Sequence, residues 1–200
     1  LLMTKGYTGF GAIYGTWITS TEPGMEWDRA LLEYCRGERE IPAWGISTAD
    51  YHEEGLGGEK LGNFPTVFLV KKKTRDEVLL ALKQGRMYAC RSGNNFQRFV
   101  LQDFSVSDSN TNSQANMGDT LELNSKPEIR INVSSSDQKV HNVDVRIIRS
   151  GKLIRTISKT TPFAVDFKDD YFNPGELIYY RLEIPGKLVS NPIFVKFGRD

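Results

Sequence analysis

The stretch TVFLVKKKTRDEVLLALKQGRMYAC, residues 66–90, carries the strongest signals for the fold. It opens on an unbroken β-branched and aromatic run, which predicts a strand buried on both faces. Thr74 and Glu77 match the capping box, in which two side chains satisfy backbone donors of the first helical turn. The helical pattern that follows ends at Gly85, and residues 87–90 predict a second strand. Strand, helix and strand with short links indicate an α/β fold.

The same alternation is present upstream. Residues 26–36 have apolar residues at helical spacing and are followed by Gly37, a common helix stop. Residues 43–48 form a short apolar run that predicts a strand. In the helix after Thr74, periodicity places four residues on the inward face: Val78, Leu79, Ala81 and Leu82.

The chain changes character near residue 100, where helical periodicity disappears. Turn signals separate seven strand-like segments: 99–106, 128–134, 143–150, 152–157, 163–167, 177–184 and 193–197. Seven short strands over about 100 residues predict an antiparallel, Ig-like sandwich. We therefore divide the chain into residues 1–96 and 97–200. We expect no long helix between residues 120 and 197, and no continuous sheet that runs through both halves.

Composition excludes several classes of protein. The chain has 200 residues, of which 39% are hydrophobic, enough for a packed core. Its 26 basic and 25 acidic residues nearly cancel, so no charge footprint for nucleic acid is present. No apolar run is long enough for a membrane segment. The two cysteines, Cys35 and Cys90, form no disulfide framework.

A carboxylate and an imidazole lie two residues apart in the run IPAWGISTADYH, residues 41–52. Side chains two apart at the end of a strand point to the same side, so Asp50 and His52 are expected within reach of one ion. An oxygen and an imidazole together suit Zn, Mn or Fe better than Ca. The only other histidine is His141. The alternative is that Asp50 caps a turn and His52 is an ordinary loop residue.

The same run resembles the last metal-binding motif of the PHP (polymerase and histidinol phosphatase) metallohydrolases, a strand that ends in Asp-x-His. The segment EVLLALKQGRMYA, residues 77–89, resembles a helix-to-strand element of that family. Residues 180–186 and 190–195, YRLEIPG and SNPIFV, resemble the closing strands of a sandwich appended to its larger members. The His-x-His motif that opens the family's barrel is missing from the sequence.

This resemblance implies a fold and an activity. Residues 1–96 would be the C-terminal part of a PHP-like (β/α) barrel, and residues 97–200 its companion sandwich. Asp50 and His52 would bind divalent metal ions (Zn, Mn or Fe) in an enzyme that hydrolyses a small phosphorylated substrate. Because the other metal ligands are absent, we expect a fragment that is inactive alone. Its partner would be the missing N-terminal part of the barrel or an oligomer mate.

Three further side chains are candidates for the same site. Arg91 pairs well with a phosphate or carboxylate, and Tyr88 is able to orient or protonate a leaving oxygen. Arg86 has the same chemistry as Arg91. The structural alternatives are that Arg86 binds the carbonyls at the helix end and that Tyr88 packs in the core. Glu53 and Glu54 follow the motif on a glycine-rich loop, where solvated acids are the usual case.

A second functional class is a non-catalytic binding module. In that case the sandwich contacts a glycan, a partner or its own first half, and the Asp-x-His pair is vestigial. Candidate contacts are the neighbouring aromatics Tyr171 and Phe172 and the pair Tyr179 and Tyr180. Metal content discriminates between the two classes.

Overall fold

The computed structural model describes residues 2–15, 19–56, 60–93, 95, 97–108, 110–111 and 113–198. Its first half contains, in chain order, β1 (Gly9–Ile13), η1 (Thr19–Thr21), α1 (Glu26–Cys35), β2 (Trp44–Ser47), β3 (Thr66–Phe68), α2 (Arg75–Gln84) and β4 (Met87–Cys90). Its second half contains β5 (Phe99–Ser107), β6 (Gln114–Asn116), β7 (Thr120–Leu123), β8 (Glu128–Ser135), β9 (Asn142–Arg149), β10 (Lys152–Thr160), β11 (Phe163–Lys168), β12 (Leu177–Ile184), β13 (Leu188–Ser190) and β14 (Ile193–Phe197).

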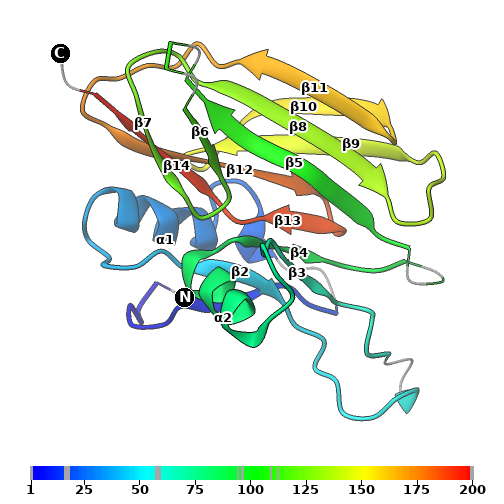
Figure 1. The fold of residues 1–200 in the computed structure, drawn as a ribbon. Coiled ribbons are helices and arrows are strands. Elements are labelled where there is room, and N and C mark those ends of the chain that lie inside the picture. Colours follow the sequence, from blue (N-terminus) through cyan, green and yellow to red (C-terminus); the bar gives the residue numbers. More distant parts are fainter. Residues whose placement is uncertain are drawn as a thin grey trace.

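The second half forms two stacked sheets (Figure 1). One has the order β11-β8-β5-β6, and the larger one runs β10-β9-β12-β13-β4-β3, with β14 beside β12 and β7 beside β14. Side chains from both sheets meet in one apolar core that includes Phe104, Ile131, Val145 and Leu182. The prediction of a β-sandwich is confirmed, and no α-helix lies in the described residues after Gln84.

The prediction of an α/β barrel portion is wrong. A barrel of this kind needs parallel strands throughout, and among the described residues of the first half the only parallel pair is β1 with β2. Strands β3 and β4 are antiparallel, although α2 connects them, with Val67 opposite Tyr88. They continue the larger sandwich sheet, because β4 pairs with β13. The expectation that no sheet runs through both halves is therefore also wrong.

Helix α2 has the predicted N-cap at Thr74, but only half of the predicted capping box, because the Glu77 carboxylate accepts from the Lys71 N–H and the Thr74 N–H donates to the Lys72 carbonyl. The helix is also buried differently from the prediction. The Thr74 hydroxyl accepts a hydrogen bond from the Glu77 backbone N–H at 3.4 Å. Gly85 ends the helix in the left-handed region, at φ +72, and a Cβ there would lie 2.5 Å from the Trp44 ring. Leu79 is 43% exposed, so its predicted inward position is wrong. The helix lies on the outside of the molecule and buries only Ala81.

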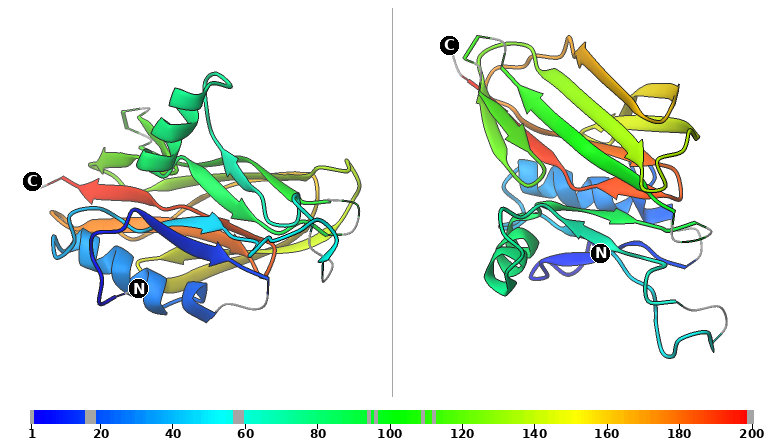
Figure 2. Two further views of the ribbon diagram at one scale, coloured as in Figure 1. Left: turned by 90° about the horizontal axis from the view of Figure 1, so that it is seen from below. Right: turned by 45° about the vertical axis from the view of Figure 1, so that its right-hand side comes forward.

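The elements of the first half that are not strands of the larger sheet, α1, β1 and β2 among them, pack on its outer face. Figure 2 shows α1 and β1 beneath that sheet, while the chain after β2 projects away from the layers. A second apolar cluster joins Trp27, Leu31 and Trp44 to Tyr179 and Phe194 of the sandwich. Strand β12 is consequently buried on both faces. Much of the apolar surface of residues 1–96 is covered by the same chain, and the expected barrel partner or oligomer mate stays a prediction.

No helix in the described ranges has the length and apolar character needed to cross a membrane. The division at residues 96 and 97 stays a prediction, because the larger sheet uses strands from both sides of it.

The buried side chain of Asn191 links β2 to β4. Its amide oxygen accepts from the Gly45 N–H at 2.7 Å, and its amide nitrogen donates to the Gly45 and Met87 carbonyls at 3.1 and 3.0 Å. One side chain thus satisfies backbone groups of two strands that share no ladder. Ser47 adds a second link, since its hydroxyl donates to the Cys90 carbonyl and accepts from the Cys90 N–H.

We predict that Asn191→Ala destabilises the protein by about 3 kcal/mol or more, because each buried polar group left unpaired costs about 1–3 kcal/mol. Asn142→Ala is the matched control, since Asn142 is exposed on β9. Urea unfolding of both variants measures the effect. Equal stabilities would show that Asn191 does not hold the two strands.

Candidate functional site

The carboxyl ends of three strands meet at one edge of the first half. β1 and β2 are parallel, and after a register shift between Gly11 and Ile13 the residue Ile13 lies opposite Ser47. Ser47 is also hydrogen-bonded to Cys90, the last residue of β4. The residues that follow these strands therefore leave from a common edge. They include Tyr14 after β1, Asp50 and His52 after β2, and Arg91 after β4.

Asp50 and His52 lie close together on this edge. Asp50 Oδ1 is 4.0 Å from His52 Nε2, and the side chains are 63% and 65% exposed, respectively. The Tyr14 hydroxyl donates to the other oxygen of Asp50, Oδ2, at 2.8 Å. Asp50 itself has φ +51, a left-handed conformation that Asp tolerates better than most residues. Among the described residues no backbone N–H donates to its carboxylate, so the structure gives no support to the turn-cap alternative.

The separation of the Asp50 and His52 donors is near the upper limit for two ligands of one divalent ion. Metal–oxygen and metal–nitrogen bonds are about 2.0–2.2 Å, so one ion spans donors up to about 4.2 Å apart when they lie opposite each other, and about 3.4 Å apart in a tetrahedral site. The observed 4.0 Å is wider than the tetrahedral spacing, so the two side chains must move closer together to share an ion of that geometry. The hydrogen bond from Tyr14 holds Asp50 Oδ2, so the other oxygen, Oδ1, faces the His52 imidazole. In metal sites, hydrogen bonds of this kind orient the carboxylates that bind the ion. Within the described ranges no group of three or more His, Cys, Asp or Glu side chains is placed to hold an ion.

Arg91 lies between two cavities. It lines one of about 150 Å³ together with Tyr14, and another of about 430 Å³ together with Ser92 and Lys187. Its guanidinium carbon is 5.7 Å from the centre of the Phe64 ring. No carboxylate forms an ion pair with Arg91 or Lys187 in the part of the chain that the structure describes. Arg91 is therefore able to bind an anion.

The other candidates lie elsewhere. Tyr88 is buried in the sandwich core, where its hydroxyl accepts from the Leu101 N–H at 3.3 Å. Burial raises the pKa of Tyr88 to about 12, which makes it a poor proton donor near neutral pH. Arg86 forms an ion pair with Asp119 at 3.2 Å. The Glu54 carboxylate accepts from the Leu61 N–H at 3.1 Å and so closes its own loop. The structure does not bring Tyr88 to the Asp50 pair.

The aromatic residues considered for a binding module pack within the protein. Tyr179 and Tyr180 are fully buried. The Arg149 guanidinium lies 4.1 Å from the centre of the Tyr171 ring, and Phe172 packs against Phe197 with ring centres 5.0 Å apart. None of the four side chains offers a flat exposed face for a ligand.

Sequence reasoning missed Tyr14, Glu22 and Glu183. Tyr14 contacts Asp50 from 36 residues away, and no spacing rule connects them. Glu22 and Glu183 both bond to Arg146, in a cluster assembled from three distant segments. Glu183 carried one usable signal, since an acidic residue within the apolar run of residues 177–184 is an unusual buried charge.

No protein-family model matches this chain, and no curated protein matches it. The likeness to the PHP motif and the assignment of Asp50 and His52 as metal ligands remain predictions.

The pKa of Tyr88 gives a test of its position. A tyrosine whose pKa is raised by folding stabilises the native state below its unfolded pKa of about 10 and loses that contribution as pH rises toward 12. Between pH 8 and pH 11 wild type should lose about 1.4 kcal/mol relative to Tyr88→Phe. Urea unfolding of both proteins at the two pH values measures the difference. A constant difference would mean that Tyr88 ionises near pH 10, as a solvent-exposed phenol does.

Proposed function

We propose that this chain provides a divalent-metal site of a hydrolase that acts on phosphate esters, with Asp50 and His52 as ligands. The observation that carries the proposal is their separation of 4.0 Å, with Oδ2 of Asp50 already held by Tyr14. An exposed, pre-oriented carboxylate beside an imidazole has the chemistry of a Zn, Mn or Fe site.

Each residue at this edge has a separate role in the proposal. The metal, when bound, lowers the pKa of water and neutralises charge on phosphoryl oxygens. Tyr14 keeps the Asp50 carboxylate turned toward His52. Arg91, which has no carboxylate ion-pair partner among the described residues, binds the phosphoryl group through its planar guanidinium.

Two protein ligands make a weak and incomplete site. Catalytic zinc sites commonly use three protein ligands and a water molecule. Water and phosphate oxygens would fill further positions on an ion bound here. We therefore expect the chain by itself to bind a solvent-exposed metal ion weakly and to hydrolyse phosphate esters slowly.

We predict that Zn²⁺ or Mn²⁺ binds wild type and that Asp50→Ala or His52→Ala weakens binding at least tenfold, since even outer-shell changes at metal sites cost about 10–100-fold. Isothermal titration calorimetry measures the affinity. His141→Ala and Asp76→Ala are matched controls that remove the other histidine and an exposed carboxylate. If wild type and the four variants bound the metal with equal affinity, Asp50 and His52 would not be its ligands.

The phosphate part of the proposal has its own test. Bound metal should raise the affinity for inorganic phosphate in wild type, because a cation beside Arg91 adds attraction for an anion. The metal-dependent increase should vanish in Asp50→Ala, while metal-free phosphate binding through Arg91 is retained. Phosphate affinity that ignores the metal in wild type would refute a phosphoesterase site.

A further inference from the structure

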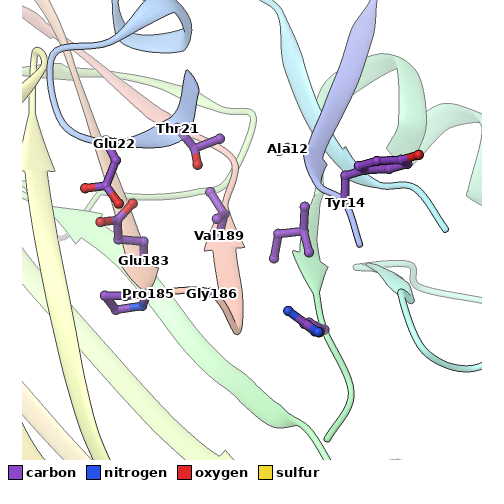
Figure 3. A pocket seen from close by; sticks show the side chains of 10 residues that line it. Ala12, Tyr14, Thr21, Glu22, Glu183, Pro185, Gly186 and Val189 are labelled. Carbon is purple, nitrogen blue, oxygen red and sulfur yellow. The ribbon is translucent and has the colours of Figure 1, made fainter. Parts of the chain in front are cut away.

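The cavity of about 150 Å³ lies between the first half and the β12–β13 hairpin (Figure 3). Its walls combine apolar residues with charged ones. Ala12, Ile13, Pro185 and Val189 form the apolar part, and Thr21 adds a polar side chain. Since a water molecule takes about 30 Å³ in the liquid, the space corresponds to about five waters. A ligand of a few heavy atoms fits this volume.

One end of the cavity is acidic. Figure 3 shows the carboxylates of Glu22 and Glu183 side by side, on the side of the cavity opposite Tyr14. Both bond to the same atom, Arg146 Nη1, at 3.2 Å each. Two carboxylates therefore share one arginine, which leaves this end one negative charge in excess.

The neighbouring Arg181 does not remove the excess. Its guanidinium forms two bonds with the Asp28 carboxylate, at 2.7 and 2.8 Å, and these two charges cancel. Its remaining contact with Glu183 is longer, at 3.4 Å. Burial raises the pKa of Glu183 above its usual value, which means that the protein environment disfavours the charged carboxylate. A bound cation would offset this free-energy cost.

Arg91 gives the cavity a positive wall. It is exposed, lines the cavity and forms no ion pair with a carboxylate in the described ranges. The cavity thus presents an excess of negative charge at Glu22 and Glu183 and an available cation at Arg91. The intervening surface of Ala12, Ile13 and Val189 offers no polar side chain.

We propose that this cavity binds a small zwitterion, with its ammonium group at Glu22 and Glu183 and its anionic group at Arg91. The anion is a carboxylate or a phosphate, since arginine pairs with either. The apolar wall would contact the short carbon chain between the two charges. The inference does not require the metal, because none of the three residues that recognise the ligand ligates the ion, although it shares Arg91 with the proposed phosphoryl site.

The test compares each zwitterion with its singly charged analogue on the full chain without metal. β-Alanine is compared with propionate, and phosphoethanolamine with ethyl phosphate, by calorimetry or ligand-observed NMR. We expect at least one zwitterion to bind about tenfold or more tighter than its analogue, which corresponds to about 1.4 kcal/mol. The pair that shows the preference identifies the anion.

Two variants locate the groups responsible. Glu22→Gln should abolish the preference for the zwitterion, and its side chain is 31% exposed, so folding is expected to survive. Arg91→Gln should weaken binding of the zwitterion and of the anionic analogue alike. Glu122→Gln, an exposed acid on β7, is the matched control. Circular dichroism checks that every variant is folded.

Three results would overturn the inference. The first is that neither zwitterion binds detectably at ligand concentrations up to about 10 mM, which is about the weakest affinity expected for a specific ligand of this size. The second is binding of each zwitterion no tighter than its analogue. The third is a preference that Glu22→Gln leaves unchanged in a folded protein.

Discussion

The side-chain amide of Asn191 connects two strands that make no ladder with each other. A carboxamide has one acceptor and two donors, and here it meets the Gly45 N–H and the carbonyls of Gly45 and Met87. Without it, three backbone groups in a buried layer would lack partners. The residue follows β13, so the sandwich itself sets where β2 lies against β4. The position of Asp50 and His52 depends on that placement, because both residues follow β2.

A second buried contact orients the helix that covers the sheet. Arg181, on β12, is fully buried and binds Asp28 of α1, while Trp27 lies over its guanidinium at 4.8 Å. Its Nη2, which also donates to Asp28 Oδ2, donates to the Thr21 carbonyl at 2.9 Å and so fixes the segment that carries Glu22. Buried ion pairs add little net stability compared with apolar packing, but they penalise other arrangements. This pair determines how the acidic end of the cavity is built.

Local signals predicted local structure well. The N-cap at Thr74 and the glycine stop at Gly85 define α2, and alternation located seven strands of the sandwich but missed the short strands β6, β7 and β13. The direction of β3 relative to β4 was not predictable, because a strand–helix–strand sequence usually gives parallel strands and here gives antiparallel ones. The barrel interpretation failed at this point. The pairing of β4 with β13, 98 or more residues later, had no local signal.

The residues of the candidate site also divide into those that a local sequence signal predicts and those that it does not. Asp50 and His52 were found because two-residue spacing is a local property, whereas Tyr14, Asn191 and the Glu22–Arg146–Glu183 cluster depend on contacts between distant segments.

The central claim is that this local pair is held ready for one ion. Anomalous diffraction from crystals soaked in Mn²⁺ tests it most directly. The account predicts one peak within about 2.2 Å of both Asp50 Oδ1 and His52 Nε2. A peak bound to only one of them, or placed elsewhere on the protein, would contradict it.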